Sequence, residues 1–137
     1  MTKVKPKVII ADDEVHCRAL LKAILSSMNC EVICEARNGV ETVELYSQFQ
    51  PHLLLLDINM PLKTGEQVLE EIIARHPDAF VIMLTSVADR EHVQKCLNLG
   101  AANYIRKDTP IAEIKTIIRD TWQSFMSKRV KATKQEG

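Results

Sequence analysis

Apolar residues follow two different spacings along this chain. Short continuous apolar runs, such as Leu53-Leu54-Leu55-Leu56, alternate with longer stretches in which apolar residues recur every third or fourth position. The runs predict buried strands, and the stretches predict helices that bury one face. The predicted strands are residues 7–11, 31–36, 53–56, 80–84 and 103–105. Because these runs do not alternate polar with apolar residues, we expect a parallel sheet covered by helices on both faces.

Four of the intervening helices have a clear apolar face, and the helix predicted at 39–49 has the weakest. The apolar positions are 21, 24, 25 and 28 in the first helix, 68, 69, 72 and 73 in the third, 93, 96, 97 and 100 in the fourth, and 111, 114, 118, 122 and 125 in the last. We expect the last helix to begin with Thr109 as N-cap and Pro110 at its first position, and to run for about four turns. Repeated strand–helix units of this kind predict an open, doubly wound α/β sheet.

Length and composition narrow the class of protein. The 137 residues suit one domain, and 46% apolar with 26% charged residues is typical of a globular protein. Lys plus Arg equals Asp plus Glu, at 18 each, so no direct nucleic-acid binding is expected. No apolar run approaches the ~20 residues of a membrane span, so we expect no membrane insertion and a cytoplasmic location. The four cysteines, Cys17, Cys30, Cys34 and Cys96, have neither zinc-site nor disulfide-framework spacing.

Polar residues follow the ends of four predicted strands. They are Asp12, Asp13 and Glu14 after the first strand, Asp57 after the third, Thr85 and Ser86 after the fourth, and Lys107 after the fifth. The carboxyl ends of parallel strands lie at one edge of a sheet, where ligands bind in this fold class. Converging carboxylates repel one another unless a cation neutralises them, and Mg²⁺ suits a few carboxylates and waters.

Such a site suits a phosphoryl group. Asp57 could accept it as an acyl phosphate, while Lys107 and the Thr85 hydroxyl could contact its oxygens. The alternative gives each residue a separate role: Asp12 and Asp13 would cap the first helix, Asp57 would be a loop residue, and Lys107 would be a surface charge.

These motifs resemble the receiver domains of two-component response regulators. The similar segments are Val8–Glu14, Leu54–Pro61 with Gly65, Ile82–Ser86 and Gly100–Lys107. The resemblance implies a flavodoxin-like (βα)5 fold with a five-stranded parallel sheet in the order 2-1-3-4-5. Residues 1–127 would form the receiver domain, and 128–137, with four basic residues and one acid, would form a basic, flexible tail.

The resemblance also implies the role of each residue. Asp57 would receive a phosphoryl group from a sensor histidine kinase or a histidine phosphotransfer protein. The surface of the last two strand–helix units would then change its affinity for an output protein, as in chemotaxis receivers, and a phosphorylation-dependent dimer is possible. Mg²⁺ would be bound by Asp13, Asp57, the backbone carbonyl of Asn59 and, through water, Asp12. The phosphoryl group would be bound by Thr85, Ser86 and Lys107. The switch pair would be Thr85 and Tyr104.

Several positions depart from the pattern, among them Ser86, where Ala or Gly is usual, and Lys63, where an apolar residue is common. The lysine of the family is normally followed by proline, whereas Asp108 follows Lys107. Val87 cannot orient an attacking water by hydrogen bonding, so we expect slow self-dephosphorylation.

Two other functions remain as alternatives. One is a pseudo-receiver that binds partners without phosphorylation. The other is a Mg²⁺-dependent phosphohydrolase with an aspartyl nucleophile. The phosphohydrolase is disfavoured because Asp12 and Asp13 are adjacent, rather than spaced as D-x-D on the first strand, and because the chain is too short for a cap.

Overall fold

The computed structural model describes residues 5–86 and 89–136, with side chains to residue 128. Within it, five parallel strands form one sheet in the order β2-β1-β3-β4-β5, as predicted. The elements are β1 (Lys7–Ala11), α1 (Val15–Ser27), β2 (Glu31–Ala36), α2 (Gly39–Phe49), β3 (Leu53–Asp57), α3 (Gly65–Arg75), β4 (Val81–Thr85), α4 (Arg90–Leu99), β5 (Asn103–Arg106) and α5 (Ile111–Glu136). The doubly wound α/β fold is therefore confirmed.

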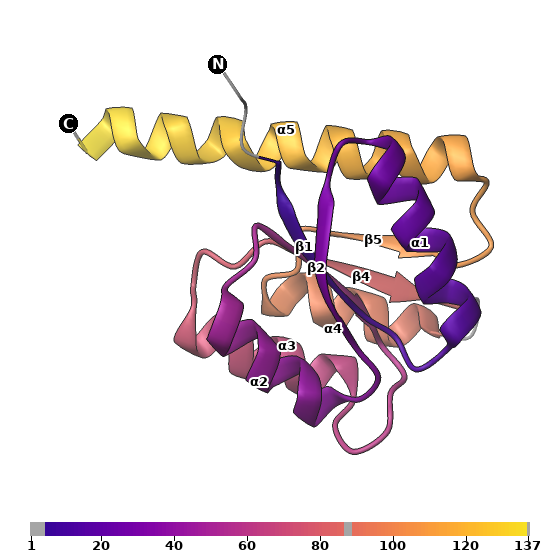
Figure 1. Ribbon diagram of the computed structural model, residues 1–137. Coiled ribbons are helices and arrows are strands. Elements are labelled where there is room, and N and C mark those ends of the chain that lie inside the picture. Colours follow the sequence, from indigo (N-terminus) through magenta and orange to yellow (C-terminus); the bar gives the residue numbers. More distant parts are fainter. Residues whose placement is uncertain (1–4, 87–88, 137) are drawn as a thin grey trace.

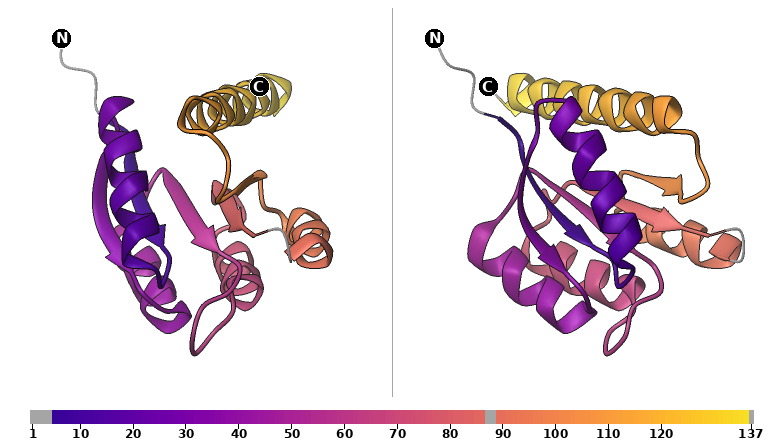
Figure 2. Two further views of the ribbon diagram at one scale, coloured as in Figure 1. Left: turned by 90° about the vertical axis from the view of Figure 1, so that its right-hand side faces the viewer. Right: turned by 45° about the vertical axis from the view of Figure 1, so that its right-hand side comes forward.

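Helices cover both faces of the sheet (Figures 1 and 2). One apolar cluster joins α1 and α5 to one face, through residues such as Leu25 and Ile118. The other joins α2, α3 and α4 to the opposite face, through residues such as Tyr46, Leu69 and Cys96. All residues of β3 and β4 are buried, because both faces of these central strands are covered.

The direction of winding reverses between β1 and β3, which are hydrogen-bonded neighbours. Ala11 at the end of β1 is paired with Leu56, and Asp57 at the end of β3 is paired with Leu84. Thr85 belongs to β4 and is paired with Arg106, the residue before Lys107. This register brings the chain segments that carry the predicted site residues to one edge of the sheet.

The helix with the weakest apolar pattern is present as predicted. Its N-cap is Asn38, whose side chain accepts a hydrogen bond from the backbone N–H of Glu41 at 2.8 Å. This cap stabilises the first turn of α2, although the apolar face of the helix is weak.

The prediction for the last helix was wrong in two respects. The carbonyl of Pro110 accepts hydrogen bonds from the N–H groups of Glu113 and Ile114, so Pro110 rather than Thr109 is the N-cap. The helix also continues to Glu136, beyond the predicted four turns, and extends past the sheet in Figure 1. An apolar face is found only along the part of a helix that packs on a core. The apolar positions of this helix end at residue 125, so the sequence did not indicate the turns that follow. The described part of the chain contains no helix with the length and apolarity to cross a membrane.

Candidate functional site

Four acidic residues meet at the reversal point of the sheet. Asp12, Asp13 and Glu14 follow β1, Asp57 ends β3, and carboxylate oxygens of all four lie within 4.8 Å of one another. The side chain of Asp12 is fully buried and that of Asp57 nearly so, whereas Asp13 and Glu14 are exposed. Neither Asp12 nor Asp13 is the N-cap of α1, which is Glu14, so the capping alternative is wrong. The predicted convergence of the carboxylates is confirmed.

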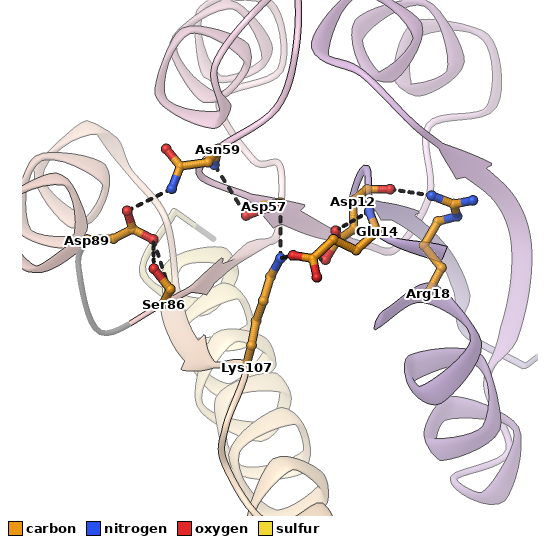
Figure 3. A network of polar contacts seen from close by, with 8 residues as sticks. All are labelled: Asp12, Glu14, Arg18, Asp57, Asn59, Ser86, Asp89 and Lys107. Carbon is orange, nitrogen blue, oxygen red and sulfur yellow. Dashed lines mark hydrogen bonds and ion pairs between the residues drawn. The ribbon is translucent and has the colours of Figure 1, made fainter. Parts of the chain in front are cut away.

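Lys107 reaches into this acidic cluster from the end of β5 (Figure 3). Its ammonium nitrogen lies 3.0 Å from Asp12 Oδ2, 2.9 Å from Glu14 Oε1 and 3.1 Å from Asp57 Oδ2. The backbone N–H of Lys107 donates to the carbonyl of Thr85 at 2.8 Å and so continues the pairing of β5 with β4. The peptide bond between Lys107 and Asp108 is trans. Lys107 therefore reaches the cluster without the proline that usually follows it, and it is not an isolated surface charge.

The charges in the cluster perturb one another. Burial, and then the charge of Asp12, raise the pKa of Asp57 to about 7, although Lys107 acts in the opposite direction. Burial of Lys107 favours its neutral form, but the hydrogen bond to Glu14 and the charge of Asp57 outweigh burial and raise the pKa of Lys107. The cluster therefore lacks positive charge, because one ammonium faces four carboxyl groups.

Two carboxylates of the cluster have fixed orientations. The backbone N–H of Glu14 donates to Asp12 Oδ1 at 2.9 Å, and that of Asn59 donates to Asp57 Oδ1 at 3.2 Å. Asp12 Oδ2 is fully buried and accepts no hydrogen bond from the described residues, although it is ion-paired with Lys107. A buried oxygen of this kind fits a water bound to a cation, and oxygen donors are those that Mg²⁺ prefers. The residues present therefore fit a magnesium ion.

The end of β4 is held by a residue that the sequence analysis missed. The buried carboxylate of Asp89 accepts hydrogen bonds from the Ser86 N–H and hydroxyl, both at 2.9 Å, and from the Asn59 side-chain amide at 2.8 Å. Figure 3 shows these contacts to the left of the acidic cluster. Ser86, expected to contact a phosphoryl group, is thus bonded to Asp89 in this structure. An acidic residue at the start of a helix was the only signal in the sequence.

The predicted switch residues border a common cavity. Thr85 is buried, whereas the Tyr104 side chain is 40% exposed on the neighbouring strand. Thr85, Ser86, Val93, Tyr104 and the arginines Arg90 and Arg106 line a cavity of about 350 Å³. Space is therefore available beside Thr85 on the side of Tyr104. Val87, expected to slow dephosphorylation, lies outside the described residues.

Comparison with known proteins identifies the family. Residues 8–119 match the response regulator receiver domain, so the chain belongs to the receiver domain family. It is 39% identical over 101 residues to the chemotaxis protein CheY of Halobacterium salinarum, covering 74% of this chain and 83% of that protein. It is also 37% identical over 109 residues to the uncharacterized transcriptional regulatory protein YhcZ of Bacillus subtilis, covering 79% of this chain and 51% of that protein.

Solved structures support the same assignment. The CheX–CheY–BeF3–Mg²⁺ complex from Borrelia burgdorferi matches with a TM-score of 0.80 and 29% identity, over 85% of this chain and 88% of that one. The REC domain of AraT, a response regulator from Geobacillus stearothermophilus, matches in fold with a TM-score of 0.83 at 23% identity, over 92% and 99% of the two chains. The chain is thus a two-component receiver domain with the flavodoxin-like fold.

Proposed function

We propose that this receiver domain is a phosphoacceptor switch that takes its phosphoryl group on Asp57. The observation that carries the proposal is the position of Asp57: its buried carboxylate shares one ammonium, from Lys107, with Asp12 and Glu14. The donor would be the phosphohistidine of a sensor histidine kinase or a histidine phosphotransfer protein. A carboxylate oxygen of Asp57 attacks phosphorus, the phosphorus–nitrogen bond breaks, and the donor histidine leaves with that electron pair.

Magnesium would be held by Asp13, Asp57 and the backbone carbonyl of Asn59, with Asp12 acting through a bound water. When bound, the ion neutralises the negative charge that gathers around the phosphoryl oxygens. Asp12 and Asp57 cannot both stay ionised at low cost in this buried position, since the charge of Asp12 already raises the pKa of Asp57. Asp12 Oδ2 is ion-paired with Lys107 but accepts no hydrogen bond from the described residues, and this, together with the raised pKa of Asp57, supports a cation at this point.

Three further residues would bind the transferred group. Lys107 would exchange its contact with Asp57 Oδ2 for a phosphoryl oxygen, since the ammonium already lies 3.1 Å from the acceptor. The hydroxyl of Thr85 would donate to a second oxygen. Ser86 would donate to the phosphoryl group only after leaving Asp89.

The response to phosphorylation would pass through Thr85 and Tyr104. Movement of Thr85 toward the phosphoryl group would let Tyr104 turn into the cavity that they both line. This change would alter the surface of α4, β5 and α5 and so its affinity for an output protein. The output protein would be another cytoplasmic protein rather than DNA, and phosphorylation could also favour a dimer. Residues 128–137 would act as a basic extension of the receiver domain.

The proposal is tested by intact-mass spectrometry after incubation with phosphoramidate, a small donor with a phosphorus–nitrogen bond. We expect the mass of one phosphoryl group to be added in the presence of Mg²⁺. The gain should be absent in EDTA and in the Asp57→Asn variant. If the folded protein gains no mass with Mg²⁺, the chain is a pseudo-receiver instead. Release of phosphate in many turnovers, rather than one stable addition, would indicate a phosphohydrolase.

A further inference from the structure

A buried arginine lies behind the acidic cluster, on the side away from Lys107. Arg18 belongs to the first turns of α1, and only 7% of its surface is exposed. One guanidinium nitrogen, Nη1, donates to the backbone carbonyl of Asp12 at 2.6 Å, and Nε donates to Glu35 Oε1 on β2 at 3.1 Å. Figure 3 shows Arg18 beside Asp12, at the opposite end of the network from Asp89.

These bonds fix the peptide group that joins Asp12 to Asp13. The N–H of Asp12 donates to the carbonyl of Ala36 at 3.0 Å, so β2 holds one side of the residue. Arg18 holds its carbonyl, and the Arg18 N–H donates to the carbonyl of Glu14 at 3.2 Å. Because a peptide group is planar, fixing the Asp12 carbonyl also fixes the direction in which the chain enters Asp13.

Because Arg18 is buried, few other side chains could make the same hydrogen bonds at position 18. A buried guanidinium is stable only when its donors are paired, and its planar fork can serve two acceptors in different directions. Glu35 supplies one acceptor and is held in turn by Lys22 at 3.1 Å. A lysine at position 18 would keep the positive charge but could not reproduce both directed bonds.

We propose that Arg18 is a positioning residue for the magnesium ligands: through the Asp12 carbonyl it sets the orientation of Asp12 and Asp13. The inference rests on the proposed function, because it assumes that these carboxylates bind Mg²⁺. Lys107 would move to the phosphoryl group during the reaction. Arg18 is bonded to the backbone carbonyl of Asp12 and to Glu35, and it would keep these bonds throughout. Residues that orient metal ligands in this way typically change metal affinity by about 10–100-fold when replaced.

The test is the Mg²⁺ dissociation constant of the full chain, measured by isothermal titration calorimetry. We expect Arg18→Met, which keeps the aliphatic stem, to weaken binding by about 10-fold or more. Arg18→Lys should weaken it nearly as much, because charge alone does not orient the peptide. Lys22→Met, which removes the exposed second partner of Glu35, should stay within about twofold of the unchanged protein.

A second control separates positioning from general destabilisation. Leu25→Ala removes a fully buried side chain from the same helix, away from the cluster. It should lower the melting temperature and leave the Mg²⁺ affinity unchanged.

A folded Arg18→Met or Arg18→Lys variant with unchanged Mg²⁺ affinity would overturn the inference. If Arg18→Met does not fold, Glu35→Met, which removes the acceptor of the Arg18 Nε–H, provides the test: the inference predicts several-fold weaker binding, and unchanged binding would contradict it. If the unchanged protein binds no Mg²⁺, the proposed function fails, and the inference about Arg18 fails with it; if the unchanged protein binds Mg²⁺ and the folded Arg18 variants bind it equally well, the inference about Arg18 fails alone.

Discussion

The ammonium group of Lys107 lies 3.1 Å from the carboxylate of Asp57, although β4 separates the two strands that carry them. The same ammonium contacts Asp12 and Glu14, so one cation serves three carboxylates at the carboxyl edge of the sheet. Lys107 thus stabilises the metal-free protein and, in our proposal, also binds the phosphoryl group.

Replacing Lys107 with methionine should destabilise the metal-free protein. The buried carboxylates of Asp12 and Asp57 would lose their nearest cation, and we expect a loss of about 1–3 kcal/mol in the free energy of unfolding at pH 8. Urea denaturation in EDTA measures it. Lys63→Met is the matched control, because within the described part of the chain Lys63 forms its ion pair with the partly exposed Glu71, and it should change stability by less than about 1 kcal/mol. Equal effects of the two substitutions would contradict the account.

The stability of the metal-free protein should fall as the pH rises from about 4 to about 7. The pKa of Asp57 is raised to about 7 in the folded protein, from 3.8, so the folded state holds a proton that the unfolded state has released. The contribution of Asp57 therefore becomes less favourable through this range and is constant above it. Asp57→Asn should remove this part of the slope and stabilise the protein at pH 8 by about 1–3 kcal/mol. Urea melts of both proteins at pH 5 and pH 8 test this; a loss of stability in Asp57→Asn at pH 8 would contradict it.

Magnesium binding should depend on pH in the opposite sense. Mg²⁺ requires the ionised form of Asp57, so its affinity should increase as the pH rises toward and past about 7. Titration calorimetry at pH 6 and pH 8 should give a dissociation constant about 10-fold lower at pH 8. Equal affinities would show that Asp57 is already ionised at pH 6.

Asp89→Ala should loosen the end of β4. The Ser86 N–H and the Asn59 side-chain amide would lose their acceptor, and we expect amide hydrogen exchange at Ser86 to accelerate by about 10-fold or more. The control is Asp108→Ala, which removes an exposed carboxylate paired with Arg106. Unchanged exchange at Ser86 in the Asp89 variant would show that this carboxylate does not hold the segment.

Gly65→Ala should damage the fold and the site together. A Cβ at Gly65 would overlap the Asp57 carbonyl and lie 2.8 Å from the Ile58 Cα, both in rigid backbone. We expect a loss of about 2–4 kcal/mol in the free energy of unfolding, measured by urea denaturation, together with weaker Mg²⁺ binding. A variant of unchanged stability would mean that the loop after β3 can move away from α3.

The sequence pattern was sufficient to predict a doubly wound parallel sheet and the meeting of Asp57 with Lys107, whereas the strand order came from the resemblance to receiver domains. Continuous apolar runs require a sheet covered on both faces, and parallel strands bring their following residues to one edge. The sequence did not reveal Arg18 or Asp89, because each acts through hydrogen bonds to segments that are distant along the chain. Arg18 lies in a helix whose other basic residue, Lys22, is solvent-exposed, and only the burial of Arg18 in the structure sets it apart. The full length of α5 was missed for a different reason: its final turns carry no apolar face that a pattern could detect.

The most direct test of the central claim is to locate the phosphoryl group. After phosphorylation with phosphoramidate and Mg²⁺, reduction with borohydride converts an aspartyl phosphate to homoserine, and peptide mass spectrometry identifies the changed residue. Our account predicts homoserine at position 57 alone, with none in the EDTA control. Homoserine at Asp12 or Asp13, or none in a folded protein, would contradict the assignment of Asp57 as the phosphoacceptor.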